Sequence, residues 1–184
     1  KNGVISQKPH PAVFGDKMKH PYITTDFSES QVEMITPPMP NIDQALGFLE
    51  TIHDIVSNEL NNEYLWPQSI PPVLPADEFV PIARYANLGK NEVQYRVKLA
   101  KKYGRKKQAM SGIHFNFSFD ESLMQSLFQN SVHQLTYAEF KNAVYLKITR
   151  QMLRFRWLYV LLYGNSPMAD KSFDVKCRDF PVYF

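Results

Sequence analysis

The fold prediction rests on residues 108–119, which read Gln108-Ala109-Met110-Ser111-Gly112-Ile113-His114-Phe115-Asn116-Phe117-Ser118-Phe119. Successive side chains of a β-strand point to opposite faces, so this stretch divides into two rows. The largely apolar row comprises Ala109, Ser111, Ile113, Phe115, Phe117 and Phe119, and the largely polar row comprises Gln108, Met110, Gly112, His114, Asn116 and Ser118. The pattern predicts a strand with one face on a core and the other face wet, which is typical of an antiparallel sheet.

The polar row allows two interpretations. In the first interpretation the strand is an ordinary amphipathic strand, and its polar row faces solvent. Alternatively, the row forms the floor of a ligand site, because Gly112 leaves room for a ligand to approach the backbone. Alternation of residue types does not decide between the two.

Other segments outward from this strand predict an α+β fold. The apolar pattern and the turn residues indicate the following elements: strands within 22–25 and 31–35, a helix from Asn41 or Asp43 to about Leu60, a loop over 63–82, a basic helix over 92–107 that breaks at Gly104, a short helix near 120–130, and a long helix over 137–163. The first helix is expected to bury Leu46, Leu49, Ile52 and Val56. The long helix is expected to bury Phe140, Val144, Ile148, Met152, Phe155, Leu158 and Leu162.

Composition excludes several classes of protein. The 184 residues are 44% hydrophobic, which is too apolar for a disordered chain, and the net charge of +3 does not argue for nucleic acid. The apolar stretch 157–163 is far shorter than the ~20 residues that span a bilayer. A single cysteine, Cys177, allows no internal disulfide and fits a reducing, cytoplasmic setting. We therefore expect no membrane and no nucleic-acid partner.

The basic run 101–107 has three interpretations. It could bind nucleic-acid phosphate, it could be a solvated helix end where cations complement the helix dipole, or it could attract a nucleotide.

Three carboxylates, Asp26, Glu29 and Glu33, lie close together in the sequence. Such oxygen ligands suit Mg²⁺, which also takes phosphate oxygens. Asp26 and Glu33 are seven positions apart and would face opposite sides of one straight strand. Both can serve one site only if the polar residues 27–30 bend the chain. The alternative is a solvated strand end.

Several stretches together resemble the glutamate–cysteine ligase family, and most of all the ligase portion of the bifunctional bacterial glutathione synthases. They follow one another in family order over about residues 9–170, and they are His20-Pro21-Tyr22-Ile23-Thr24-Thr25-Asp26-Phe27-Ser28-Glu29, Val32-Glu33-Met34-Ile35-Thr36-Pro37, Leu65-Trp66-Pro67-Gln68-Ser69-Ile70-Pro71, Tyr95-Arg96, Tyr103-Gly104, Ser111-Gly112-Ile113-His114-Phe115-Asn116-Phe117-Ser118, Leu153-Arg154-Phe155-Arg156-Trp157-Leu158 and Tyr163-Gly164-Asn165-Ser166-Pro167.

The resemblance implies a glutamine-synthetase-like fold, in which a curved antiparallel sheet carries helices on its outside. It also implies a reaction: ATP phosphorylates the γ-carboxylate of glutamate, and the amino group of cysteine attacks the acyl phosphate, which is the first step of glutathione biosynthesis. Two or more Mg²⁺ ions would assist the transfer. A homodimer, or fusion to a glutathione synthetase domain, would be compatible with the family.

Matched by position, Asp26, Glu33 and His114 correspond to metal-binding residues of the family, and His114 is also near the substrate. Arg96 corresponds to an arginine that meets nucleotide phosphate, so His114 and Arg96 are the candidate catalytic residues. The cysteine pocket corresponds to Tyr95, Leu99 and Gln108, and Asn116 corresponds to a residue near the glutamate site.

The sequence also departs from the family. A Gly-Leu-Glu-Arg-Glu strand with two metal-binding glutamates and the later half of the catalytic domain are not in it. We therefore expect residues 1–184 to form one partial domain that does not catalyse the ligation alone. Two alternatives stay open: another carboxylate–amine ligase with a different acceptor, and a non-catalytic remnant that binds a nucleotide or a partner.

Overall fold

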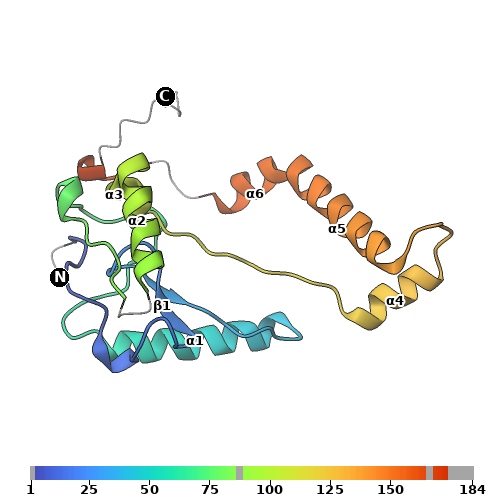
Figure 1. Cartoon of the computed structure of the whole chain (residues 1–184), viewed down its shortest axis with the longest axis horizontal. Helices are drawn as coiled ribbons and strands as arrows, with labels where there is room; N and C mark the ends of the chain where they lie inside the picture. Colours follow the sequence, from blue (N-terminus) through green and yellow to red (C-terminus); the bar gives the residue numbers. More distant parts are fainter. Residues whose placement is uncertain (1–2, 86–88, 165–167, 174–184) are drawn as a thin grey trace. The chain divides into compact units, whose positions relative to one another are not determined.

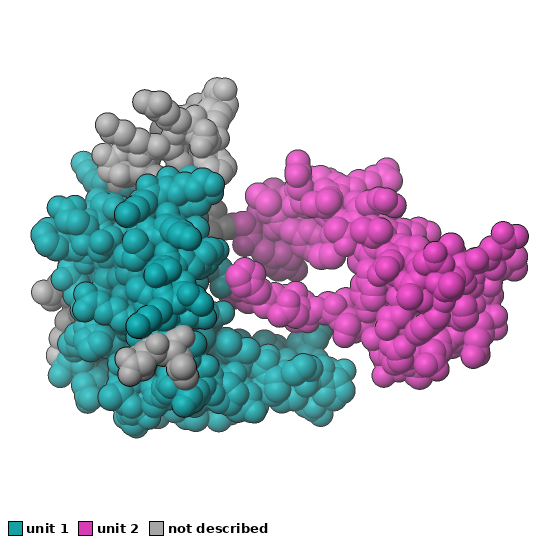
Figure 2. Space-filling model, viewed as in Figure 1, with its two compact units in different colours: residues 1–112, 168–184 teal, residues 113–167 magenta. Residues whose placement is uncertain are grey.

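The computed structural model describes residues 3–85, 89–164 and 168–173 (Figure 1). The chain divides into two compact units, residues 1–112 with 168–184 and residues 113–167 (Figure 2). The helices are α1 (Ile42–Glu59), α2 (Lys90–Tyr103), α3 (Arg105–Gln108), α4 (Glu121–Gln129), α5 (Tyr137–Arg154) and α6 (Arg156–Tyr163), with short 3-10 turns at Ala12–Phe14, Asp77–Phe79 and Lys171–Phe173. Two strands, β1 (Ile23–Thr25) and β2 (Val32–Met34), form the sheet of the described residues. The predicted α+β class is confirmed.

The β-branched and alternating sequences predict the two short strands, and the structure pairs them in an antiparallel hairpin. Thr24 lies opposite Glu33, and the Asp26 amide donates to the Gln31 carbonyl, 3.1 Å away. The polar residues between the strands thus bend the chain back on itself.

Helix α1 begins where the sequence indicates, because the Asn41 side chain accepts a hydrogen bond from the Gln44 amide at 2.9 Å. Ile52 and Val56 on α1 are buried in one core cluster with Phe14 and Ile23. The predicted apolar stripe is confirmed at Ile52 and Val56, but Leu46 at its start is 52% exposed. The helix therefore covers the hairpin with its second half.

A second small core joins Leu74, Val80 and Ala109, the residue that follows α3. Gly104 ends α2 at φ 82°, a backbone conformation that favours glycine, which explains the predicted break. The Asp77 carboxylate then accepts hydrogen bonds from the Arg105 and Lys106 amides at 2.8 and 2.9 Å, at the start of α3. The basic run 101–107 is thereby the end of one helix and the start of another.

The strand predicted over residues 108–119 is wrong for this structure. Gln108 ends α3, and residues 110–120 have no regular secondary structure. A strand needs a hydrogen-bonded neighbour, and among the described residues no backbone amide from His114 to Ser118 donates a hydrogen bond. Ile113 is 95% exposed and Phe115 73%. Alternation of apolar and polar residues shows that the side chains favour a strand with two different faces. It does not provide the neighbouring strand with which the backbone must pair.

The second unit contains α4, α5 and α6. Thr136 and Glu139 form a capping box at the start of α5. The long helix expected over 137–163 has the right ends but is interrupted at Phe155, whose φ of −99° and ψ of 9° end the α5 geometry before α6 begins. The spacing of apolar residues fits one continuous helix as well as two consecutive helices, because an interruption of one residue hardly changes that spacing.

The buried stripe predicted for the long helix is also wrong: no described residue of α5 or α6 is buried. The aromatic ring of Phe128 on α4 packs against Tyr137 and Phe140, which covers the first turns of α5. Beyond them, Met152 is 53% exposed. The sequence pattern states which side prefers apolar surroundings, whereas burial requires another layer of structure. No helix within the described ranges combines the length and apolar character needed to cross a bilayer.

Candidate functional site

Arg96 on α2 reaches across to the hairpin. Its Nε donates to the Asp26 carbonyl at 2.7 Å and its Nη2 to the Thr25 carbonyl at 3.4 Å. Its Nη1 donates to the Glu92 carbonyl at 3.2 Å, one turn earlier on α2. Three backbone carbonyls therefore orient the guanidinium, and none of the ion pairs formed by the described residues involves it.

The register of the hairpin determines how Asp26 and Glu33 are arranged relative to each other. Glu33 lies opposite Thr24, and Asp26 follows Thr24 by two residues, so alternation assigns both carboxylates to the same side of the hairpin. Ile23 and Thr25 occupy the other side and are buried, whereas Asp26 and Glu33 are exposed. Residues diagonal across two strands are about 7–8 Å apart, a separation that two ligands of one hydrated cation site can bridge.

Glu29, the third carboxylate of the group, has a different environment. It is 8% exposed and accepts hydrogen bonds from the Lys17 ammonium at 2.6 and 2.7 Å. The backbone amides of His10 and Arg84 also donate to it, at 2.8 and 2.5 Å. Burial alone would raise the pKa of Glu29, but these hydrogen bonds and the Lys17 charge outweigh burial and lower the pKa below its ordinary value. Glu29 joins three chain segments and has no free side for a metal.

His10 lies beside this ion pair. Both its ring nitrogens are buried without a hydrogen-bond partner among the described residues, and its ring packs against Phe14 at a centroid distance of 5.5 Å. Burial and the nearby Lys17 charge lower the pKa of His10, so the ring is neutral near pH 7.

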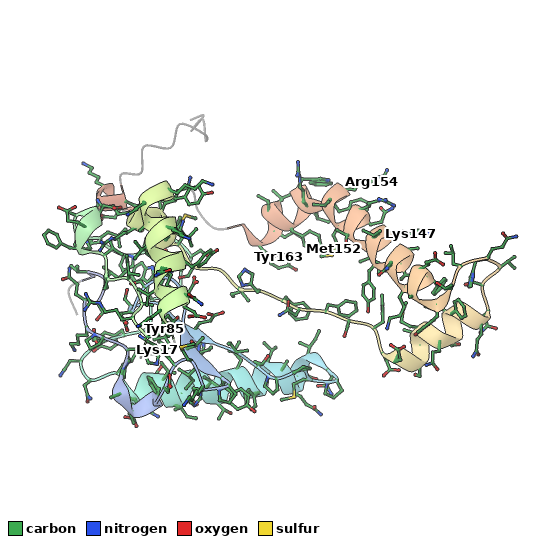
Figure 3. The ribbon with its side chains drawn as sticks, viewed as in Figure 1. Lys17, Tyr85, Lys147, Met152, Arg154 and Tyr163 are labelled. Carbon is green, nitrogen blue, oxygen red and sulfur yellow. The ribbon has the colours of Figure 1, made fainter. Side chains whose placement is uncertain are left out.

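Tyr85 contacts both cations of this region. The Lys17 Nζ lies 5.2 Å from the centre of the Tyr85 ring, and the Arg96 Cζ lies 4.9 Å from it. Figure 3 shows the Lys17 and Tyr85 side chains close together in the first unit. The Tyr85 hydroxyl donates to the Thr25 carbonyl at 3.1 Å and lies 3.2 Å from the Thr25 hydroxyl.

Gln31 connects the hairpin to the chain that follows α3. Its amide nitrogen donates to the carbonyls of Gln108 and Met110, at 3.1 and 3.2 Å, and to the Ser111 hydroxyl at 3.1 Å. Its amide oxygen accepts from the Ser28 amide at 3.0 Å. The Gln31 side chain is only 8% exposed, and its hydrogen bonds hold the end of α3 at Gln108 close to the hairpin.

The structure divides the predicted site residues between the two units. Asp26, Glu33, Tyr95, Arg96, Leu99 and Gln108 belong to the first unit, and His114 and Asn116 belong to the second. Tyr95 and Leu99 are one turn apart on α2 and share a side of that helix; Tyr95 is 61% exposed. His114 and Asn116 are exposed in the extended segment after Gly112.

Sequence reasoning missed Lys17, Tyr85 and Gln31, because their roles arise from contacts across long chain separations. It did single out Glu29, but as a possible metal ligand. Within the ranges that the structure describes, no group of three or more His, Cys, Asp or Glu side chains could hold a metal ion. Asp26 and Glu33 can therefore supply two ligands of such a site. Cys177 lies outside the described residues.

The sequence model of the glutamate–cysteine ligase family matches residues 1–181. The chain belongs to the glutamate–cysteine ligase family. Among curated relatives, the glutathione biosynthesis bifunctional protein GshAB of Desulfotalea psychrophila is 50% identical over 178 residues, which are 96% of this chain and 23% of the relative. The glutamate–cysteine ligase of Clostridium acetobutylicum is 41% identical over 94% of this chain and 36% of its own length.

Two solved structures of glutamate–cysteine ligase relatives share the fold. A bifunctional glutathione synthetase from Pasteurella multocida gives a TM-score of 0.84 at 40% identity, covering 90% of this chain and 22% of that protein. The glutamate–cysteine ligase of Francisella tularensis, solved in complex with AMP, also gives 0.84, at 30% identity over 93% of this chain and 34% of that protein. The chain thus spans about a quarter of the length of the GshAB relatives it matches.

Proposed function

We propose that this chain forms part of the catalytic site of an ATP- and Mg²⁺-dependent glutamate–cysteine ligase, which makes γ-glutamylcysteine in the first step of glutathione biosynthesis. Family membership supports the reaction class. The observation that carries the proposal for these residues is the arrangement at the hairpin. There Arg96 is oriented by backbone carbonyls and forms no ion pair with a carboxylate of the described residues, and the exposed Asp26 and Glu33 lie on the same hairpin.

The chemistry of the donor set fits magnesium. Mg²⁺ is bound in nucleotide sites by one or two carboxylates together with phosphate oxygens and water, and Asp26 and Glu33 are two such carboxylates. When bound, the ion would neutralise phosphate charge during transfer. We assign His114 to the same metal site by its match to the family, and its placement in the complete ligase is part of the proposal.

Arg96 would hold a phosphate of ATP. A guanidinium presents several donors in a fixed plane, and its positive charge stabilises the negative charge that builds up as the γ-phosphoryl group moves to glutamate. The cysteine amino group would then attack the acyl carbon, which forms the amide bond, breaks the bond to the phosphate oxygen and releases inorganic phosphate and a proton. Because the acyl phosphate is already reactive, binding and orientation would provide most of the rate enhancement. Tyr95, Leu99 and Gln108 would line the cysteine pocket, and Asn116 would lie near glutamate.

The proposal extends to the setting of the whole protein. Its catalytic sheet would have the curved, antiparallel form of a glutamine-synthetase-like fold, with helices on its outside. The protein would be cytoplasmic, and a homodimer or a fused glutathione synthetase domain would fit the GshAB relatives.

Calorimetric titration of the 184-residue chain with ADP tests the proposal. We expect binding that requires Mg²⁺ and that weakens about tenfold in Arg96→Ala, because a charge-assisted contact contributes on the order of 1.5 kcal/mol. Asp26→Ala and Glu33→Ala should each reduce the dependence on Mg²⁺. Lys98→Ala, an exposed cation on the same helix and outside the basic run 101–107, is the matched control and should bind like the parent chain.

Nucleotide binding that is independent of Mg²⁺ and indifferent to Asp26→Ala and Glu33→Ala would instead favour a non-catalytic remnant. A coupled assay of ADP release with glutamate, cysteine and Mg·ATP is the complementary measurement. We expect no turnover by this chain alone, and robust turnover would contradict the proposed division of the site.

A further inference from the structure

Tyr85 stands between the hairpin and α2, at the point where Arg96 meets β1. We propose that Tyr85 is a positioning residue, which fixes the Arg96 guanidinium in the orientation needed to receive a phosphate. The positioning is a property of this chain; that the anion is a nucleotide phosphate rests on the function proposed above.

The Tyr85 ring is anchored to the hairpin through its hydroxyl. The hydroxyl donates to the Thr25 carbonyl at 3.1 Å and is 3.2 Å from the Thr25 side-chain oxygen. Thr25 belongs to β1 and is 1% exposed, so the anchor is part of the folded core. The ring therefore keeps a fixed place relative to the Thr25 and Asp26 carbonyls.

The Arg96 guanidinium meets both the ring and those carbonyls. Its Cζ is 4.9 Å from the ring centre, and its Nε is 2.7 Å from the Asp26 carbonyl oxygen. An aromatic face carries partial negative charge and attracts a cation without neutralising it as a carboxylate would. This arrangement limits the rotation of a long side chain and keeps its positive charge available to an anion.

A second contact holds α2 against Tyr85. Gly89 precedes the first residue of α2, and a Cβ added there would lie 2.2 Å from the Tyr85 Cβ and 2.8 Å from the Met18 sulfur. Real carbon atoms do not approach so closely, so the start of α2 can lie against Tyr85 only because residue 89 is glycine. Tyr85 thus sets the position of α2 near its start and at Arg96, almost two turns later.

Lys17 provides an internal comparison at the same ring. Its Nζ is 5.2 Å from the ring centre but is also bonded to the buried Glu29 carboxylate at 2.6 Å. The charge of Lys17 is therefore paired, whereas Arg96 forms no ion pair with any carboxylate in the described ranges. Of the two cations at Tyr85, Arg96 is the one available to a phosphate.

The test uses the full 184-residue chain with ¹⁵N-labelled arginine. The exchange rate of the Arg96 Nε proton with water reports the order of this side chain with no nucleotide present. In Tyr85→Leu we expect this proton to exchange about tenfold faster, because the cation–ring contact and its steric restraint are lost. Tyr85→Phe keeps the ring but loses its hydroxyl anchor to Thr25, so its exchange rate should lie between those of the parent chain and Tyr85→Leu. The affinity for Mg·ADP should follow the same order.

Tyr103→Leu is the matched control, since Lys102 lies 4.9 Å from the Tyr103 ring on the same helix, away from the hairpin. It should leave the Arg96 proton unchanged. Circular dichroism verifies folding of each variant, and Gly89→Ala, which keeps the ring but forces α2 away from it, replaces Tyr85→Leu if that variant does not fold. An unchanged Arg96 exchange rate in the folded variant would overturn the proposal.

The two proposals fail in different ways. If the parent chain binds no Mg·ADP but its Arg96 proton responds as expected, Tyr85 still positions Arg96 and the proposed nucleotide site is wrong. If Mg·ADP binds and the Arg96 proton does not respond to Tyr85→Leu, the nucleotide site stands and the positioning role of Tyr85 is wrong.

Discussion

Residues 31–34 of the hairpin and residues 108–119 both alternate between polar and apolar side chains, but only the first stretch forms a paired strand. In the hairpin, Thr24 and Glu33 lie opposite each other and Ile23 is buried. In the later stretch, Phe115 and Ile113 are exposed and no described residue pairs with the backbone from His114 to Ser118. The hairpin needs only a nearby turn to bring its partner, whereas the later stretch needs a partner from elsewhere. Alternation is therefore sufficient for structure only where the partner is local.

The two compact units also differ in how completely their apolar side chains are buried. The first unit buries Val56 and Val80 completely, in two small core clusters. In the second unit, α6 is apolar around its circumference and its Leu161 is 73% exposed. Figure 3 labels Met152 and Tyr163, which lie along α5 and α6.

Hydrogen exchange should differ most between the two alternating stretches. The amides of Asp26 and Ile35 donate within the hairpin, at 3.1 and 2.8 Å. We expect them to exchange on the order of 10⁴-fold more slowly, relative to unfolded peptides, than the amides of residues 114–118. Exchange measured by NMR on the 184-residue chain checks this. Equal protection of the two stretches would show that residues 114–118 are paired.

A charge placed in the two apolar regions should have very different effects. Val56→Asp puts a carboxylate into a fully buried position, and we expect it to lower the free energy of unfolding by about 4 kcal/mol or more. Leu161→Asp, at an exposed apolar position of α6, should change it by less than about 0.5 kcal/mol. Urea denaturation followed by circular dichroism compares them. A large loss in Leu161→Asp would mean that α6 is covered.

Two ion pairs allow a matched comparison between the units. Lys17→Met leaves Glu29 buried without its cation, and we expect a loss of about 3 kcal/mol at pH 7. Lys141→Met breaks the exposed pair with Glu121, 2.8 Å apart, and should cost less than about 1 kcal/mol.

The pH dependence of these variants follows from the pKa of Glu29. This pKa is lowered in the folded chain, so its stabilising contribution is present above the unfolded value of 4.5 and is lost as the pH falls through the folded pKa. In Lys17→Met that contribution is absent, and protonation relieves the buried charge. Denaturation curves at pH 7 and pH 4 should therefore show a smaller difference between variant and parent at the lower pH. A difference that is constant with pH would contradict the assigned pairing.

Helix capping should give the smallest effect and a similar one in both units. Asn41→Ala removes the cap of α1, and Thr136→Ala removes one half of the capping box of α5. Each should cost about 1 kcal/mol, measured by thermal or chemical denaturation, because each leaves an amide of the first turn without its partner. Asn91→Ala, inside the first turn of α2, serves as the control and should have little effect.

The sequence by itself determined the elements that depend on neighbours along the chain. The Asn41 cap, the break at Gly104 and the hairpin around residues 26–31 follow from local side chains, turn residues and short chain separations. The ordered series of motifs also identified the family, and residues 1–181 match its model. Sequence reasoning stated one condition under which Asp26 and Glu33 could serve the same site, namely a bend at residues 27–30. The turn of the hairpin supplies that bend.

Only the tertiary structure decided which contacts form across long separations. It buried Glu29 against Lys17, put Tyr85 beneath Arg96, and gave Gln31 its partners beyond Gln108. It also left Ile113, Phe115 and α6 without the covering that their apolar side chains favour. The physical reason is that a sequence pattern expresses what each residue prefers, while pairing and burial also require a second surface, and the fold decides whether that surface is present.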